Sequence, residues 1–481
     1  MPSIHALSAQ EPQRLFDDID RSFQLSSQDL VGLTKAFLHE ISLGLASYGQ
    51  PMAMIPTFVT GVPDGTETGT FLALDLGGTN LRVCEVALNG DKTFSLRQQK
   101  YKVSDSLKTG EATVLFDYLA DSVDAFLTTH AASAYSYGSD VHLGLTFSFP
   151  VEQTALNAGT ILTWTKGFSA KNAIGNDVVR LLQDAFDRKH MHVKCVALVN
   201  DTVGALLSRA YTTGGCVLGA IFGTGTNGAY VEEVAKITKL SNSMAAVKGG
   251  HMVVNTEWGA FNNCRSHLPF TPFDNALDRL SINPSYQAFE KFISGMYLGE
   301  ITRNILISLI DASPIPLLFS GKSTPMLNKH YGLDTSVMSQ IEEAWEEVTL
   351  KDAAVCLLSL LFSAAYTEYQ IVRWACSLVA RRAALLSGVA VATILFQTGR
   401  ASFADKDGKF SNCTDTTRIG VGVDGSLIEH YPNYERILRE SLCSLVGKEV
   451  EKRVDIGMAK DGSGVGAALC ALQALKQRKS S

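Results

Sequence analysis

The chain has 481 residues, of which 46% are hydrophobic and 19% charged; this excludes a disordered protein and allows a large buried core. At ~100–200 residues per domain, the length indicates two or more domains. The formal net charge of −6 lacks the basic surplus of a nucleic-acid-binding protein, so no nucleic acid partner is expected.

The nine cysteines form no C-x-x-C pair, which argues against a zinc site and against a disulfide framework. We therefore expect buried thiols in a reducing, cytoplasmic compartment. The sequence does not open with a basic region followed by an apolar run, so no signal peptide is expected. The most apolar stretch, residues 383–396, is too short for a membrane span.

In the first half of the chain, apolar spacing predicts helices within residues 11–50, where Ser26 and Asp29 resemble a capping box. Residues 51–70 form a connector rich in proline and glycine, and Asn89-Gly90 is a strong hairpin signal. The elements predicted after the connector are strands at 71–76, 81–88 and about 94–103, a helix near 111–130, a strand at 142–148, a helix at about 176–189, a strand at 194–199 and a helix after Thr202.

A second cycle begins at Cys216 and repeats the opening order of apolar strand, Gly-Thr-Asn turn and strand. Two similar α/β halves, each with a glycine-rich turn, indicate a cleft between two lobes. Gly214-Gly215 is either part of a hinge between the lobes or a turn before the strand. The elements predicted here are strands at 216–222 and 229–232, largely helical segments at 270–310 and 336–398 with caps at Thr271-Pro272 and Ser285, an irregular segment around 310–335, a strand at 417–424 and a helix at 462–477.

The stretch Phe71 to Asn80, FLALDLGGTN, combines an apolar strand, an acid (Asp75) and a Gly-Gly turn. Glycine opens backbone conformations that other residues avoid, and such a turn points successive N–H groups into one concavity that suits phosphate. The carboxylate of Asp75 beside it is suited to hold Mg²⁺ directly or through water. The alternative is an ordinary hairpin with glycines in its turn.

Four acids are candidates for chemistry. Asp75 lies near the end of a predicted strand and Asp201 follows directly after another, and ligands gather at the carboxyl ends of strands in α/β sheets; for Asp201 the alternative is a helix cap. Glu257 lies among aromatic and small residues, where an acid is rarely buried without partners. Glu290 is flanked by core-type residues and lies either on a solvated helix face or in a cleft.

Other polar residues complete the candidate sites. Carboxylates and amides pair well with sugar hydroxyls, and a helix start attracts an anion or a closely approaching ligand. For the helix starts, the alternative is routine capping. The sugar-type residues are Ser148, Thr165, Lys166 and Asn227, and the nucleotide-type stretches are 422–426 and 461–466.

Eight ordered motifs resemble the hexokinase family of fungal type, including its glucokinase-like members, and the resemblance runs from about residue 15 to 475. The motifs are LDLGGTN (74–80), LTFSFP (145–150), TWTKGF (163–168), VNDT (199–202), FGTGTN (222–227), NTEWGAF (255–261), FEKFISGMYLGE (289–300) and DGSG (461–464).

The resemblance implies a two-lobe actin-like ATPase (ribonuclease H-like) fold, in which each lobe is a mixed β-sheet flanked by helices. The small lobe would take residues 72–210 plus a C-terminal helix at 461–481, and the large lobe residues 1–71 and 211–460. The implied activity is phosphorylation of the 6-hydroxyl of glucose-like hexoses by MgATP, the first step of glycolysis, by a monomer or homodimer.

The resemblance also assigns residues. Asp201 would be the base on the hydroxyl, and Lys166 would bind the sugar side and help the transferring phosphoryl group. The residues implied for sugar binding are Ser148, Thr165, Lys166, Asn200, Asp201, Asn227, Glu257 and Glu290. Those implied for the nucleotide are Asp75 (Mg²⁺ through water), Gly77, Gly78, Thr79, Asn80, Arg82, Gly223, Thr224, Gly225 and Thr226 for the phosphates, and Gly425, Ser426, Gly462 and Ser463 beside the adenosine.

The loop 262–269 departs from the family pattern, since relatives usually carry an acid soon after the residue equivalent to Phe261. The departure leaves the hexose preference open. Two other functions are weighed on the same fold. A non-catalytic hexose sensor would have no reason to keep both Asp201 and Lys166, and an actin- or chaperone-like ATPase would not need the sugar-type set.

Overall fold

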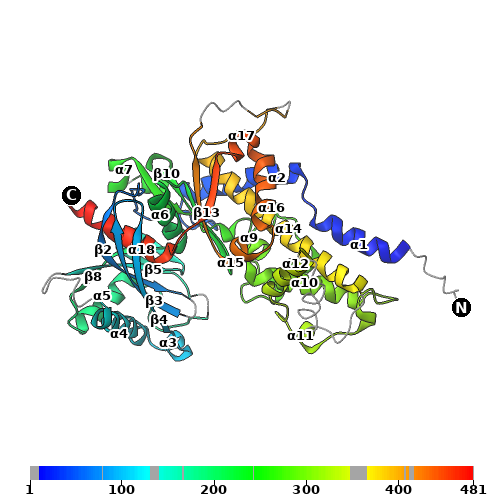
Figure 1. Ribbon diagram of the computed structural model, residues 1–481, viewed down its shortest axis with the longest axis horizontal. Helices are drawn as coiled ribbons and strands as arrows, with labels where there is room; N and C mark the ends of the chain where they lie inside the picture. The colour runs from blue at the N-terminus through cyan, green and yellow to red at the C-terminus, as the bar shows by residue number, and fades with distance from the viewer. Residues whose placement is uncertain are drawn as a thin grey trace.

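A computed structural model describes residues 10–77, 80–130, 140–164, 167–241, 243–346, 366–405, 408–410 and 416–479. Two β-sheets organise it, and Figure 1 shows them in separate groups of elements. The blue and cyan strands lie with α4 and α5 on one side of the view, and most of the long helices lie on the other.

The first sheet has five strands in the order β4-β3-β2-β5-β8. Strand β3 pairs antiparallel with both β2 and β4, while β5 pairs parallel with both β2 and β8. The predicted Asn89-Gly90 turn does join β3 to β4, and Gly90 has a φ of 80° there. The strand bounds are β2 Thr68–Leu76, β3 Asn80–Asn89, β4 Phe94–Lys102, β5 Val141–Phe147 and β8 Val193–Val199.

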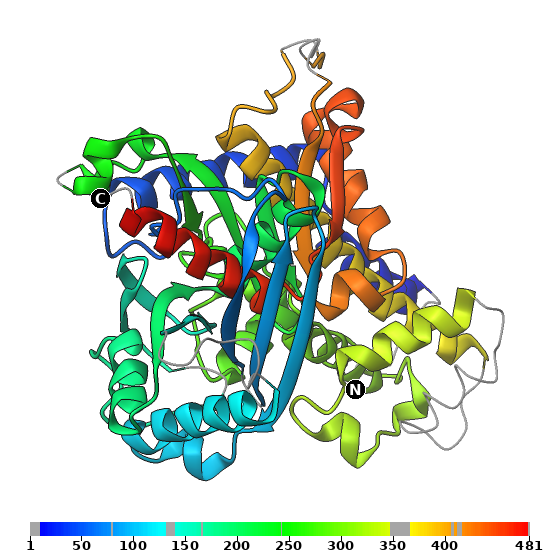
Figure 2. The same ribbon diagram turned by 60° about the vertical axis from the view of Figure 1, so that its left-hand side comes forward.

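Helices cover both faces of this sheet. α4 and α5 join its strands in one apolar cluster, and α6 and α18 join the opposite face in another. Figure 2 shows α18, in red, lying across the blue strands although it comes from the end of the chain. A hairpin, β6–β7, was not predicted. The bounds are α3 Asp105–Thr109, α4 Ala112–His130, β6 Val151–Ala155, β7 Ala158–Ile161, α5 Val178–Arg188, α6 Asp201–Thr213 and α18 Gly462–Lys479.

The second sheet has six strands in the order β1-β11-β10-β9-β12-β13. Strand β12 runs parallel to β9 and β13, and the other pairs are antiparallel, so this sheet is also mixed. The short strands β1 and β13 were not predicted. The bounds are β1 Ile55–Pro56, β9 Leu218–Phe222, β10 Thr226–Glu233, β11 His251–Asn255, β12 Ile419–Asp424 and β13 Val454–Met458.

The remaining helices surround this second sheet. The predicted capping box at Ser26 and the predicted cap at Thr271 both form, and Thr271 also makes a full capping box: Ser26 and Thr271 accept backbone N–H groups from Asp29 and Asp274. The cap predicted at Ser285 is wrong: α9 begins at Ala288, without a side-chain cap. The bounds are α1 Gln10–Phe23, α2 Ser27–Ala46, η1 Val234–Lys236, η2 Thr238–Leu240, α7 Met244–Lys248, η3 Trp258–Ala260, α8 Pro272–Leu280, α9 Ala288–Ile293, α10 Gly295–Ile310, η4 Phe319–Gly321, α11 Pro325–Asn328, α12 Thr335–Glu346, α14 Tyr366–Gln397, α15 Ser426–His430, α16 Tyr434–Val446 and α17 Lys448–Glu451.

Helix α14 runs through the core of this region. Within the described part of the chain, its residues Thr367–Gln397 form one helix long and apolar enough to cross a membrane, yet 89% of the most apolar window is buried inside the protein. Part of the segment predicted as helix at 336–398, residues 347–365, lies outside the described residues.

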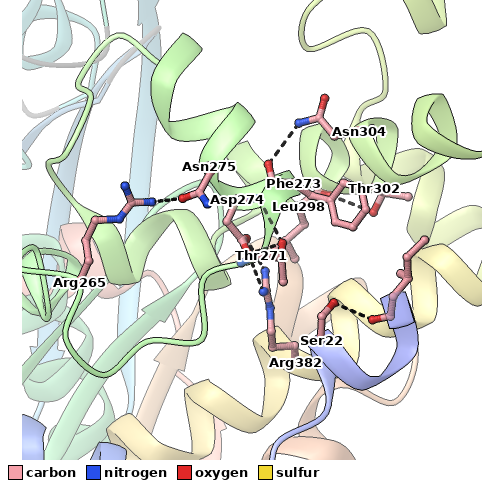
Figure 3. A network of polar contacts seen from close by, with 11 residues as sticks. Ser22, Arg265, Thr271, Phe273, Asp274, Asn275, Leu298, Thr302, Asn304 and Arg382 are labelled. Atoms are coloured by element: carbon pink, nitrogen blue, oxygen red, sulfur yellow. Dashed lines mark hydrogen bonds and ion pairs between the residues drawn. The ribbon is translucent and has the colours of Figure 1, made fainter. Parts of the chain in front are cut away.

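A buried ion pair fastens α14 to its neighbours (Figure 3). The guanidinium of Arg382, which is 0% exposed, donates to both carboxylate oxygens of Asp274 at 2.6 and 2.8 Å. Asp274 also accepts from the backbone N and the hydroxyl of Thr271 at the start of α8. The rings of Phe23 and Phe292 each lie 4.4 Å from the guanidinium. One cation thus joins α14, α8, α1 and α9.

Candidate active site

The first glycine-rich turn lies at the end of β2. The N–H of Gly77 donates to the carbonyl of Asn80 at 3.1 Å and closes the turn, while Gly78 and Thr79 lie outside the described residues. Asp75 stands opposite Arg82 on the neighbouring strand. Its Oδ2 accepts from the hydroxyl of Ser463 at 2.9 Å, so the start of α18 lies beside this turn.

Close backbone packing brings α18 to that place. A Cβ on Gly466 would lie 2.1 Å from the Cα of Gly204 in α6, and a Cβ on Gly204 would lie 2.5 Å from the carbonyl oxygen of Gly462. Only glycine allows the two helices to approach this closely. The carbonyl of Ser463 accepts from Thr146 of β5 at 2.8 Å and fixes the helix start on the sheet.

The second glycine-rich turn, Gly223 to Thr226, joins β9 to β10. Gly425 packs directly on it at a φ of 117°, and a Cβ there would lie 2.6 Å from the nitrogen of Gly223. The predicted nucleotide residues Gly425 and Ser426 therefore lie against the turn. Two N–H groups at the start of α10 donate to the carbonyls of Gly223 and Thr224, at 2.7 and 3.1 Å.

Asp201 is the first residue of α6, and the N-cap is Asn200. The Oδ1 of Asn200 accepts from the backbone N and the hydroxyl of Thr202 at 2.9 and 2.6 Å. The interpretation of Asp201 as the helix cap is therefore wrong. Its carboxylate lies at the positive end of the α6 dipole, which favours a negative charge.

Asp424, at the end of β12, links the two turns electrostatically. Burial raises the pKa of Asp424 above its ordinary value, and the charge of Asp201 raises it further, while Arg82 lowers it. Charges carried by elements of the first sheet therefore act on a carboxyl of the second sheet.

On the sugar side, a chain of amides and acids runs from β10 to β11. Asn227 Nδ2 donates to Asn255 Oδ1, and Asn255 Nδ2 donates to Glu257 Oε1, both at 2.8 Å. Glu290 of α9 accepts from the backbone N of Thr226 at 3.1 Å. The predicted sugar residues Asn227, Glu257 and Glu290 are therefore brought together beside the second turn.

The two sheets also meet at the sugar side. One cavity is lined by Phe147, Phe149 and Asn200 from the first sheet's elements and by Asn255 from β11. Ser148, which is half-buried, lies between the two lining phenylalanines in the chain. The predicted Thr165 and Lys166 lie outside the described residues.

Sequence reasoning assigned no function to Asn255 and Tyr286, and it named Asp424 only as part of the nucleotide-type stretch 422–426. Burial raises the pKa of the Tyr286 phenol, and the charge of Glu257 raises it further. Asn255 and Asp424 both end strands, which was the signal that had identified Asp75 and Asp201.

The unusual loop after Phe261 is held by Asn262. Its Oδ1 accepts the N–H groups of His267 and Leu268 at 3.0 and 2.9 Å, and its own N–H donates to Glu40 of α2 at 3.1 Å. Burial raises the pKa of this Glu40 carboxyl. A distant helix therefore supplies an acid to a loop whose sequence lacks one.

The comparisons with known proteins agree with this architecture. Two hexokinase family models match the chain, one over residues 15–211 and the other over residues 217–473. The chain belongs to the hexokinase family. It is 40% identical to the glucokinase of Aspergillus niger, over 95% of this chain and 96% of that protein, and 40% identical to glucokinase-1 of Saccharomyces cerevisiae, over 98% and 99%. The solved hexokinase from Schistosoma mansoni complexed with glucose matches with a TM-score of 0.81 at 35% identity and covers 98% of this chain and 100% of that one.

Membership of the hexokinase family confirms two predictions, the two-lobe actin-like ATPase fold and the enzyme class, a kinase that uses ATP. The residue limits of the two lobes stay a prediction, as do the individual functions of the site residues.

Proposed function

We propose that this hexokinase-family chain transfers the γ-phosphoryl group of MgATP to the 6-hydroxyl of glucose and related hexoses. The observation that carries the proposal is one cavity lined both by Asn200, the residue before Asp201, and by Asn255 of the hydrogen-bonded chain Asn227–Asn255–Glu257. The names of the fungal relatives, and the glucose in the Schistosoma mansoni structure, support glucose as the sugar.

In this reaction Asp201 accepts the proton of the 6-hydroxyl as the oxygen–phosphorus bond forms and the bond to the ADP oxygen breaks. A sugar hydroxyl needs such an acceptor because its own pKa is far above neutral, and a general base contributes ~10²–10⁴-fold. We assign Lys166 to the sugar side and the moving phosphoryl group. The residues proposed to hold the other hydroxyls are Ser148, Thr165, Asn200, Asn227, Glu257 and Glu290.

For the nucleotide, we assign the two glycine-rich turns and Arg82 to the phosphates and the helix starts at Gly425-Ser426 and Gly462-Ser463 to the adenosine side. Mg²⁺ prefers oxygen ligands and keeps several of its waters. The hydrogen-bonded carboxylate of Asp75 and hydroxyl of Ser463 offer that donor type. When bound, Mg²⁺ would neutralise phosphate charge, with Asp75 holding it through water.

A sugar kinase must also avoid hydrolysing ATP. Closing two lobes only when the sugar supplies the binding energy excludes water from the reacting phosphate. The cavity shared by Asn200 and Asn255 lies where the two sheets' elements approach. The seven cysteines that the structure describes are unpaired, which supports our proposal that the reaction takes place in the cytoplasm.

The test is ADP release measured with glucose, fructose, mannose and no sugar, for the wild type and for Asp201→Ala. We expect sugar-dependent turnover that falls by ~10²-fold or more in the variant, while glucose binding, followed by tryptophan fluorescence, persists. The matched control is Asp121→Ala, which removes an acid that is 63% exposed and paired with Lys189 at 2.6 Å; it should leave turnover unchanged.

The alternatives give different results in the same assay. Glucose binding without turnover in the wild type would support a hexose sensor. Equal ADP release with and without sugar would support an ATPase with a protein client. Unchanged turnover in Asp201→Ala would remove that residue from its assigned function.

A further inference from the structure

We propose that Asn255 is a positioning residue that fixes the orientation of both Asn227 and Glu257 toward the sugar. The inference rests on the proposed function, because it concerns how the same site holds its hexose. Asn255 is absent from the residues that the family resemblance assigned to the sugar, and the structure places it between two of them.

The backbone of Asn255 is held firmly. It is the last residue of β11, where it stands opposite Ala229 of β10 on one side and Ile55 of β1 on the other. The residue is only 5% exposed. Its side chain therefore starts from a fixed point between two neighbouring strands.

The hydrogen bonds of Asn255 run in one direction. Its Oδ1 accepts from Asn227 Nδ2 and its Nδ2 donates to Glu257 Oε1, both at 2.8 Å. Flipping the side-chain amide of Asn227 would break a further hydrogen bond, because its Oδ1 accepts from the N–H of Gly228 at 2.7 Å. Asn255 must therefore present oxygen to one neighbour and N–H to the other.

Only a short side-chain amide meets both requirements at this position. A carboxylate accepts from Asn227 but has no proton to give to Glu257, and a hydroxyl is too short to span both partners. Glu257 also has a φ of 54°, a conformation that is costly for a residue other than glycine. The partners of this carboxylate help to orient it: Asn255 donates to its Oε1 at 2.8 Å, and Asn227 donates to the same oxygen at the longer distance of 3.4 Å.

The decisive variant is Asn255→Asp, which keeps volume and acceptor but sets a second carboxylate against Glu257. Two carboxylates in hydrogen-bond contact cannot both stay ionised without a cost, so they share a proton as the pH falls. We expect the KM for glucose to rise at least ~10-fold at pH 8.5 and to recover partly at pH 5.5, where the shared proton replaces the lost donor. The kcat should stay within ~3-fold of the wild type, because Asn255 acts through its neighbours.

Two further variants complete the experiment. Asn255→Ala removes donor and acceptor together and should raise the KM for glucose at every pH without the recovery. The control Asn304→Asp adds the same charge in α10, beside Arg303, and should leave the KM and its pH dependence as in the wild type. If Asn255→Ala does not fold, the near-isosteric Asn255→Asp carries the test alone.

An unchanged KM in Asn255→Asp, or a rise equal at pH 5.5 and 8.5, would overturn the inference, as would a fall in kcat with KM unchanged. The glucose Kd from tryptophan fluorescence is measured alongside and should follow the same pH pattern. A wild type that binds glucose without turnover would refute the proposed function. The pH dependence of the glucose Kd in Asn255→Asp would still decide the inference about Asn255.

Discussion

Replacing Arg382 with methionine removes one partner of a buried ion pair while keeping an unbranched apolar side chain. Asp274, only 3% exposed, would lose two charge-assisted hydrogen bonds and retain those from Thr271. Leaving a buried charge without its partner costs ~3–5 kcal/mol. For a cooperative unit of about 300 residues, an unfolding entropy of ~2.1 cal/mol/K per residue converts this to a fall in Tm of roughly 5–8 °C.

The assay is thermal and urea unfolding, monitored by tryptophan fluorescence, with a matched control at the preceding residue. Arg381 pairs with Glu440 at 2.9 Å, but its side chain is 50% exposed, so Arg381→Met should cost less than ~1 kcal/mol. The double variant Arg382→Met with Asp274→Asn removes both buried charges and should recover at least half of the loss. A loss in Arg382→Met no larger than in Arg381→Met, or a double variant as unstable as the single one, would refute the reasoning.

Three further predictions concern the nucleotide side. Gly425→Ala should raise the KM for ATP and destabilise the fold by ~1–3 kcal/mol, because the new Cβ would lie 2.5 Å from the carbonyl carbon of Phe222 at a φ of 117°; an unchanged KM and Tm would contradict this. Ser463→Ala removes the hydrogen bond to Asp75, so the KM for ATP should rise ~3–10-fold with the KM for glucose unchanged. A general loss of fold would instead change both KM values. Asp424→Asn should become more stable relative to the wild type as the pH rises from 4 to 7. Because the pKa of Asp424 is raised in the folded state, the folded wild type binds more protons than the unfolded chain in this range. The unfolding free energy of the wild type therefore falls as the pH rises, and urea midpoints would show the difference.

The features that could be predicted from the sequence were those with local causes. The capping box at Ser26, the hairpin turn at Asn89-Gly90 and the strand before Asp75 each depend on residues a few positions apart. The cap expected at Ser285 is wrong because the conformation there does not have a local cause. Ser285 and Gln287 both adopt positive φ, which the local sequence does not predict.

The features that could not be predicted depend on partners far along the chain. Strand β13 has only five residues and is defined by its pairing with β12. In the site, the acids were recognisable as acids after strands, whereas the function of Asn255 depends on which strand lies beside β11. The acid that supports Asn262 comes from Glu40, more than 200 positions earlier.

The position of α18 sets an order of events during protein synthesis. The sheet that it covers is complete at Val199, yet the helix begins only at Gly462, so a ribosome adding ~5–20 residues per second needs roughly 15–50 s to supply it. Throughout that interval the nascent sheet lacks the cover of Val465 and Leu469, and the strand carrying Asp75 lacks its hydroxyl from Ser463. A chain cut before Gly462 is therefore expected to have no kinase activity, because α18 covers the sheet that carries Asp75.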